Sequence, residues 1–110
     1  MNQKLPKISV KMSVYNGEKY LNETIESILN QTFNDFEFII VNDASIDKTG
    51  EILEGYRKQD PRIKIVDNLT NIGLTKSLNR ALRIAQGEYV ARQDADDLSL
   101  AERFEKQIEF

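Results

Sequence analysis

Apolar positions along the chain alternate between two spacings. Four short runs rich in β-branched and aromatic residues each end at a polar loop, as strands do: Ile8 to Val14, Phe36 to Val41, Ile63 to Val66 and Tyr89 to Ala91. Each run is followed by apolar residues three or four positions apart, the spacing of one helix face, within residues 21–29, 52–56, 74–85 and 100–108. The pattern therefore predicts four strands that alternate with four helices.

The distance between strands predicts how they pair. Strand starts recur about every 25 to 29 residues, which suits right-handed crossovers between parallel strands. We therefore expect an α/β fold, Rossmann-like, with a mainly parallel sheet flanked by helices. No repeat or Gly/Ser/Pro-rich linker divides the chain, so residues 1–110 are expected to form one domain that stops inside or just after its fourth helix.

Local signals mark the ends of the predicted helices. Ser99 and Glu102 form a capping-box pattern before the last helix, Gly87 follows the third helix, and Pro61 lies just beyond the second. Asp47 is well placed to cap a helix that starts at about Lys48.

Composition removes several classes of function. A formal net charge of -3 and a pI near 5.0 argue against a nucleic-acid partner, which would require a basic face. The chain has no cysteine and no histidine, which excludes disulfides, thiolate nucleophiles and the usual zinc sites, so any metal must be held by oxygen. There is no apolar stretch long enough for a membrane span and no signal-peptide core, so a cytoplasmic location is expected.

Unusual polar residues follow three of the four predicted strands. Ligands of open parallel sheets bind at the carboxyl ends of the strands, where the loops beginning at Tyr15, Asn42 and Asp94 should meet. Three aspartates within residues 94–97 repel one another unless solvent, a basic side chain or a cation offsets their charge. An all-oxygen site suits Mg²⁺ or Mn²⁺, which also bind the oxygens of a diphosphate.

Each of these residues also has a purely structural interpretation. Asp97 can help to start a helix, and for Asp47 the helix cap is the favoured role. Asp43 stands at a strand end, where its carboxylate can serve the fold or accept a hydrogen bond from a ligand N–H. Tyr15 can be a core aromatic or can stack on a flat ligand, and Asn16 with the next glycine can be only a turn.

Five segments, taken in order, resemble the family 2 glycosyltransferases. They are an opening segment at 9–21 and 27–33, a second-strand motif at 36–49, the segment 71–73 followed by Asn79, the segment 85–89, and an acidic metal motif at 94–97. The resemblance covers nearly all 110 residues. It implies the GT-A fold, a nucleotide-sugar donor that is often UDP-linked, and a bound divalent cation, Mg²⁺ or Mn²⁺.

The same resemblance assigns roles by position. It implies that Tyr15 packs near the base, that Asp43 accepts a hydrogen bond from the base, and that Asp94 lies near the ribose or a metal-bound water. Asp96 would ligate the metal, with Asp94 as a second metal residue. Asp97 would contact these ligands rather than the metal itself. The full set of donor-binding residues expected on this basis is Val14, Tyr15, Asn16, Asp43, Asn79, Asp94 and Ala95.

The chain departs from the family pattern at two positions. Asn42 is neutral where an acid is common, and Leu78 stands where many relatives place a basic residue just before the position of Asn79. Lys76 or Arg80 could compensate near the diphosphate, but we favour solvated-surface roles for both.

The resemblance implies a transfer reaction with inversion, in which an acceptor hydroxyl attacks the anomeric carbon as the nucleoside diphosphate leaves. We expect the general base and the acceptor-binding part to lie beyond this chain, so that these 110 residues bind donor and transfer poorly. The acceptor would be a glycan or a lipid-linked saccharide of cell-surface polysaccharide synthesis, with membrane association, if any, through the missing part. The alternative is a non-catalytic, Mg²⁺-dependent nucleotide-binding module.

The surface that the rest of a longer enzyme would cover is expected to be exposed and apolar. The edge strand at Tyr89 to Arg92 is the predicted place, and a homodimer through that surface is predicted.

Overall fold

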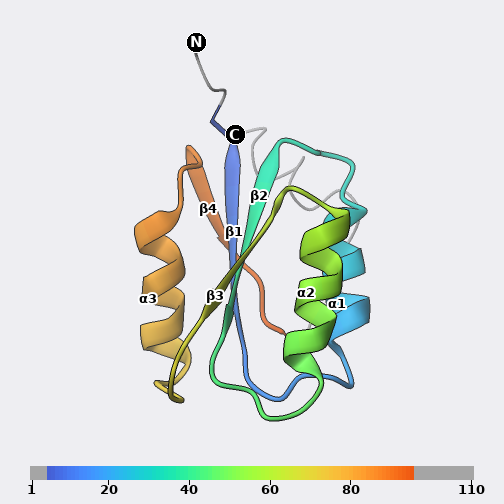
Figure 1. The fold of residues 1–110 in the computed structure, drawn as a ribbon. Coiled ribbons are helices and arrows are strands. Elements are labelled where there is room, and N and C mark those ends of the chain that lie inside the picture. Colours follow the sequence, from blue (N-terminus) through green and yellow to red (C-terminus); the bar gives the residue numbers. More distant parts are fainter. Residues whose placement is uncertain (1–4, 96–110) are drawn as a thin grey trace.

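A computed structural model describes residues 5–95, which form one four-stranded sheet with three helices (Figure 1). All strand pairs are parallel, in the order β3-β2-β1-β4. The strands are β1 (Ile8–Val14), β2 (Phe36–Asn42), β3 (Ile63–Asp67) and β4 (Tyr89–Arg92). The helices are α1 (Leu21–Leu29), α2 (Thr49–Gln59) and α3 (Leu74–Ile84).

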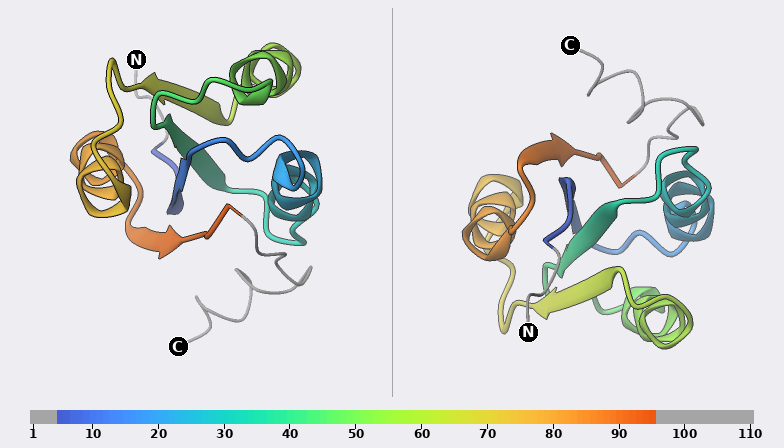
Figure 2. Two further views of the ribbon diagram at one scale, coloured as in Figure 1. Left: turned by 90° about the horizontal axis from the view of Figure 1, so that it is seen from below. Right: turned by 90° about the horizontal axis from the view of Figure 1, so that it is seen from above.

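The sheet is covered on both faces. Viewed along the strands, α1 and α2 lie on one side and α3 lies on the other (Figure 2). Every residue of β2 is buried, which explains why its sequence is nearly continuously apolar. The larger core lies under α1 and α2, whereas Ile39 and Val41 pack with Ala81 under α3.

The predicted fold class is confirmed, as are all four strands and the first three helices. β2, β3 and β4 each extend one residue further than expected, and α2 begins at Thr49. The inference drawn from Gly87 was wrong: α3 ends at Ile84, and the backbone of Ala85 is already extended. Gly87 instead lies against β1, as described below. The fourth helix, with Ser99 and Glu102, falls outside the described residues.

The strand at one side of the sheet exposes apolar side chains, as predicted. Tyr89 and Val90 in β4 are 47% and 44% exposed. Whether a second copy covers them stays a prediction. Among the described residues, no helix is both long enough and apolar enough to cross a membrane.

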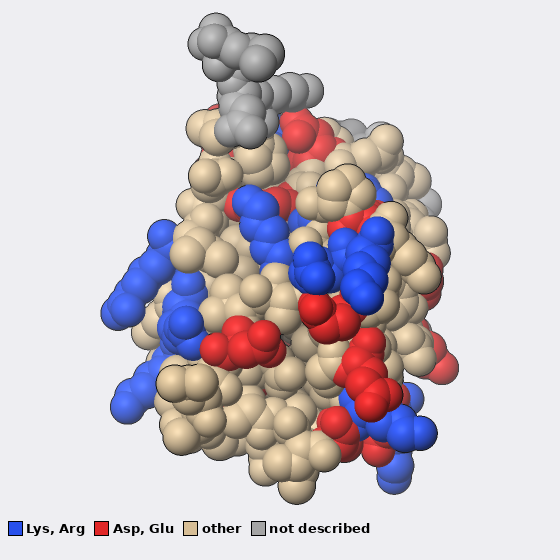
Figure 3. Space-filling view, in the orientation of Figure 1, with Lys and Arg blue, Asp and Glu red and all other residues tan. Residues whose placement is uncertain are grey.

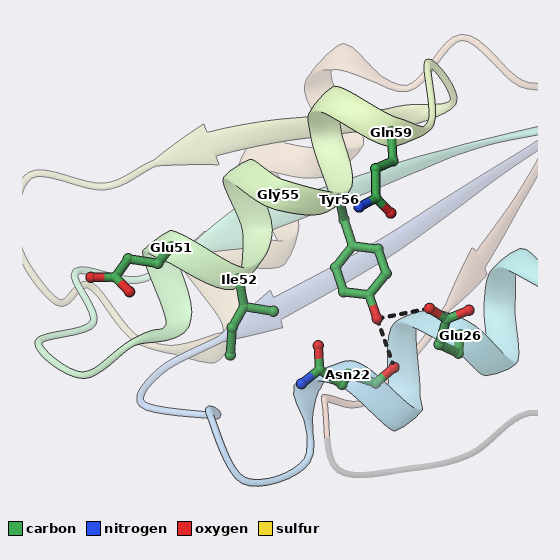
Figure 4. Close-up of a pocket in the computed structure, with 7 residues that line it drawn as sticks. All are labelled: Asn22, Glu26, Glu51, Ile52, Gly55, Tyr56 and Gln59. Carbon is green, nitrogen blue, oxygen red and sulfur yellow. Dashed lines mark hydrogen bonds between the residues drawn. The ribbon is translucent and has the colours of Figure 1, made fainter.

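Helices α1 and α2 meet across a polar groove of about 380 Å³ (Figure 4). The Tyr56 hydroxyl donates to Glu26 Oε2 at 2.9 Å and lies 3.5 Å from the Asn22 carbonyl oxygen. Burial, together with the neighbouring Glu26 carboxylate, raises the pKa of Tyr56 to about 12, so the phenol remains a donor at neutral pH. The groove contains none of the candidate residues, and its main feature is this tie between the two helices.

Candidate functional site

The loops that follow the strands gather at one edge of the sheet because all four strands are parallel (Figure 2, left). We call them loop 1 (15–20), loop 2 (43–48), loop 3 (68–73) and loop 4 (93–95). Hydrogen bonds join loop 1 to loop 2 and loop 2 to loop 3. The first three loops therefore form one connected structure.

Asn16 links loop 1 to loop 2 in both directions. Its backbone N–H donates to Ser45 Oγ at 2.9 Å, and its Oδ1 accepts from the Ile46 N–H at 2.9 Å. Asn42 Oδ1 accepts from the Ser45 N–H at 3.1 Å, so the neutral residue at this position closes the turn of loop 2. Asn16 and Ala44 both have positive φ, 51° and 60°, which is uncommon outside glycine and concentrates backbone strain in these loops.

Asp47 does more than the helix cap predicted for it. Its Oδ1 accepts from the Thr49 N–H at 2.9 Å, which satisfies one free donor of the first turn of α2, although Lys48 occupies the N-cap position. Its Oδ2 accepts from the Glu18 N–H in loop 1 at 3.2 Å. The Thr49 hydroxyl accepts from the Gly17 N–H at 3.0 Å. The start of α2 thereby holds loop 1 in place.

Tyr15 and Val14 differ sharply in accessibility. Tyr15 is 52% exposed, so the interpretation as a core aromatic is wrong and its ring is available to a ligand. Val14 is buried at the end of β1, and its carbonyl accepts from the Asp43 N–H at 2.9 Å. Val14 can frame a ligand only through its backbone.

Asp43 is almost fully buried and accepts several hydrogen bonds. Its Oδ1 accepts from the Asn68 side-chain amide and from the Ile72 N–H, both at 2.8 Å. Its Oδ2 accepts from the Gly73 N–H at 2.9 Å, and the Ser77 hydroxyl also interacts with the carboxylate. Gly73 has φ of 91°, a conformation that favours glycine. The carboxylate of loop 2 therefore anchors loop 3.

Burial opposes ionisation of Asp43, but the Ile72 N–H, the Asn68 amide and the Gly73 N–H hold the pKa of this carboxyl below its usual value. A group whose pKa is lowered by folding stabilises the fold above its unfolded pKa, here near 3.8, and loses that contribution as the pH falls towards the folded pKa.

We expect the stability difference between the wild type and Asp43→Ala to shrink as the pH is lowered from about 6 to about 2.5, because protonation weakens the anchor only in the wild type. Urea unfolding at each pH measures this difference. A difference that does not change with pH would show that the charge of Asp43 is irrelevant to loop 3.

Arg80 is exposed, as expected, but it also binds the end of β3. Its guanidinium donates to Asn68 Oδ1 and lies 3.4 Å from the Asp67 carbonyl oxygen, which orients the amide that donates to Asp43. Lys76 is exposed. Leu78 is buried on the inner face of α3, so a basic residue would fit poorly at this position. Asn79 is exposed, and no hydrogen bond joins it to another candidate residue within 5–95.

Basic side chains gather over α3 on the face shown in Figure 3. This helix carries Lys76, Arg80 and Arg83 and no acidic residue. The net charge of -3 is therefore unevenly distributed, and one side of the molecule does not repel an anionic ligand.

The backbone of loop 4 is held by hydrogen bonds, whereas its acidic side chain, Asp94, is exposed. The Ala95 carbonyl accepts from the Thr24 hydroxyl of α1 at 2.7 Å, and the Gln93 N–H donates to the Lys11 carbonyl at 2.9 Å. The Asp94 side chain is 48% exposed, with one oxygen 3.0 Å from Arg92 Nε. Within residues 5–95 its other oxygen has no hydrogen-bond donor, which suits a ligand or a cation.

Of the predicted metal residues, Asp94 lies within the part of the chain that the structure describes. Asp96 and Asp97 lie outside the described residues, and no group of three acidic side chains within residues 5–95 is close enough to hold a cation. Asp94 fits the expected donor chemistry, since Mg²⁺ and Mn²⁺ prefer carboxylate oxygens together with waters and phosphate oxygens.

Three residues that organise this edge had no assigned role in the sequence analysis: Ser45, Thr49 and Asn68. Small polar residues in loops are common and often bond locally. Their partners here are Asn16, Gly17 and Asp43, at least 25 positions away. A local pattern could mark these residues as loop formers but could not identify such distant partners.

Comparison with known proteins identifies the wider group. Residues 9–110 match the family described as Glycosyl transferase family 2. Bacillus subtilis EpsE, named as a glycosyltransferase, is 49% identical over 106 residues, which are 96% of this chain and 38% of that protein. Bacillus subtilis TuaG, named for teichuronic acid biosynthesis, is 43% identical over 105 residues, 96% of this chain and 42% of that protein.

Solved structures show the same fold. S. aureus TarS 1-349 in complex with UDP-GlcNAc matches with a TM-score of 0.86 and 38% identity, over 92% of this chain and 30% of that chain. The mannosyltransferase PcManGT from Pyrobaculum calidifontis, in complex with GDP-Man and Mn2+, matches with a TM-score of 0.78 and 29% identity, over 86% of this chain and 29% of that chain. The chain thus spans well under half of these relatives.

Proposed function

Since the chain belongs to glycosyl transferase family 2, we propose that residues 1–110 form the nucleotide-sugar-binding part of a transferase that moves a sugar, with inversion, from a nucleoside diphosphate to an acceptor hydroxyl. The observation that carries this proposal is the carboxyl edge, where an exposed Tyr15 and an exposed Asp94 flank loops that are hydrogen-bonded to one another. A UDP-linked donor is the best-supported choice, because TarS has been solved with UDP-GlcNAc.

Each candidate residue then has a defined task. Tyr15 stacks on the base, and Asn16 holds loop 1 so that the ring stays in position. Asp94 lies near the ribose or a metal-bound water, and Asp96 holds a divalent cation with it, Mg²⁺ or Mn²⁺. A cation is supported by PcManGT, which has been solved in complex with GDP-Man and Mn2+. When bound, such a cation stabilises the negative charge that develops on the leaving diphosphate.

The remaining donor-binding residues are Asp43, Val14, Ala95 and Asn79. The Asp43 carboxylate already accepts hydrogen bonds from loop 3, two at Oδ1 and one at Oδ2. We therefore expect a base N–H to approach Oδ2. The backbones of Val14 and Ala95 frame the donor. Asn79 would reach it from α3, where its exposed side chain is free of competing contacts with the other candidate residues.

We place the acceptor among glycans or lipid-linked saccharides of cell-surface polysaccharide synthesis. The name of TuaG, which gives teichuronic acid biosynthesis, supports this context. The alternative of a non-catalytic nucleotide-binding module has less support, because residues 9–110, which include these loops, match a family of glycosyltransferases. No described residue is proposed as the general base.

The proposal predicts metal-dependent binding of UDP. Calorimetric titration of UDP in the presence of Mn²⁺ should give saturable heat that disappears when EDTA removes the metal. Asp94→Asn and Asp96→Ala should each weaken binding at least about tenfold, or about 1.4 kcal/mol. Asp67→Asn, an exposed acid at the end of β3, is the matched control and should bind normally.

Two results would count against this proposal. One is the absence of heat from a sample whose circular dichroism shows the folded state. The other is binding that persists in EDTA, since the aspartates would then not act through a cation.

A further inference from the structure

A buried acid lies at the opposite end of the sheet from the candidate site. Glu37 of β2 is 3% exposed and stands beside Ser9 of β1. Its Oε2 accepts from the Ser9 hydroxyl at 2.5 Å and from the Gln86 N–H at 2.7 Å, and its Oε1 accepts from Lys64 Nζ at 2.6 Å. Ser9 Oγ in turn accepts from the Gly87 N–H at 2.7 Å.

These contacts hold the backbone turn that leads into β4. Gln86 and Gly87 lie between α3 and β4, at the end of the molecule away from the carboxyl-edge loops (Figure 1). Two side chains from the centre of the sheet thus bind two consecutive N–H groups of that turn. Backbone pairing alone does not distinguish one register of a strand from another, whereas this pair of contacts exists in one register only.

Register matters more for β4 than for the other strands. β4 pairs with β1 over four residues, Tyr89 to Arg92, the shortest pairing in the described sheet. A slip of one residue would turn each side chain of the strand to the other face. Asp94 follows two residues after β4, so its position depends directly on this register.

A charged residue at this position requires compensation. Burial opposes ionisation of Glu37, but the Gln86 N–H, the Lys64 ammonium and the Ser9 hydroxyl hold the pKa of its carboxyl below the usual value. Each of its two oxygens therefore has a partner. A fully satisfied buried polar network is suited to specifying one arrangement of the backbone.

We propose that Glu37, together with Ser9, is a positioning residue that sets the register of β4 and thereby places Asp94 at the carboxyl edge. Glu37 does not touch the donor. The consequence for ligand binding rests on the proposed function, whereas the control of β4 does not.

The test uses the ligand-free protein first. Amide hydrogen exchange followed by NMR should show Tyr89 and Gln93 exchanging at least about tenfold faster in Glu37→Leu, with β2 amides changed far less. The Tyr89 N–H bonds to the Lys7 carbonyl, just before β1, and the Gln93 N–H bonds to the Lys11 carbonyl in β1. Glu37→Gln, which keeps an acceptor for Ser9 and the turn, should restore most of the protection. If Glu37→Leu does not fold, Ser9→Ala removes the other bond to the turn, from the Gly87 N–H, and should also accelerate exchange at Tyr89 and Gln93.

Lys64→Met is the matched control. It removes the partly exposed Lys64 partner of Glu37 and leaves the bonds to Ser9 and the turn intact, so β4 protection should change less than about twofold. In the second stage, Glu37→Leu should weaken Mn²⁺-dependent UDP binding at least about tenfold while Lys64→Met does not.

Unchanged exchange at β4 in Glu37→Leu and Ser9→Ala would overturn the proposal, as would equal acceleration throughout β1 and β2, because that would indicate a general loss of stability. If the wild type does not bind UDP, the proposed function fails, and the exchange measurement still decides the role of Glu37.

Discussion

Replacing Gly87 with alanine is expected to lower the free energy of unfolding by about 3 kcal/mol. A methyl group on this residue would lie 2.5 Å from the Ser9 backbone nitrogen and 2.7 Å from both the Ile8 carbonyl carbon and Ser9 Oγ. The first two atoms belong to the backbone of β1 in the middle of the sheet, so they cannot rotate away. Relief requires β4 to move from β1, which also breaks the bond between the Gly87 N–H and Ser9.

Gly55→Ala is the matched control for this substitution. Gly55 lies inside α2, and nothing within 4 Å would contact the added methyl group. Alanine in a helix interior stabilises by about 0.5 to 1 kcal/mol relative to glycine. Urea unfolding of the two variants should therefore shift in opposite directions. A Gly87→Ala protein within about 0.5 kcal/mol of the wild type would show that β4 is free to move away from β1.

The prediction for Gly87 illustrates what the sequence could and could not reveal. Its position after the third helix suggested a helix end, because glycine often has that role. The structure assigns it to a close approach between the turn before β4 and a strand nearly 80 residues earlier. A local pattern contains the residue type, but the reason for that type is a contact that exists only in the assembled sheet.

The elements themselves were predictable because each is dominated by local periodicity. β2 is buried on both faces and reads as one apolar run, while α1 buries Leu21, Ile25 and Ile28 at helical spacing. Parallel pairing followed from the length of the connections, since a crossover helix fits between the strands. The parallel pairing therefore required little information beyond the order of the elements, whereas the strand order β3-β2-β1-β4 comes from the structure.

The candidate site was predictable as a location but not as a set of contacts. The carboxyl ends of parallel strands meet at one edge whatever the residues are, which placed Tyr15, Asp43 and Asp94 together. The hydrogen bonds of Asp43 depend on where loop 3 folds back. Its partners Asn68 and Gly73 are 25 and 30 positions away in the sequence.

Asp43→Ala is expected to destabilise the protein by about 3 kcal/mol, because it leaves the Asn68 amide and the Ile72 and Gly73 N–H groups without their acceptor. Urea unfolding at neutral pH measures the loss. Asp67→Ala, an exposed acid at the end of β3, is the control and should change stability by less than about 0.5 kcal/mol. A loss no larger than that of the control would mean that water replaces the carboxylate without cost.

The conservative variant Asp43→Asn separates the anchor from a contact with the base. The asparagine amide keeps one acceptor oxygen, but its NH₂ group faces N–H donors of loop 3 and cannot accept from them. We therefore expect about half the destabilisation of Asp43→Ala. Hydrogen exchange at Ile72 and Gly73 reports whether loop 3 stays closed. If the loop is protected but UDP binding is lost, the carboxylate itself meets the base. If binding falls only as protection falls, Asp43 acts through loop 3 alone, and the contact with the base implied by the family resemblance is wrong.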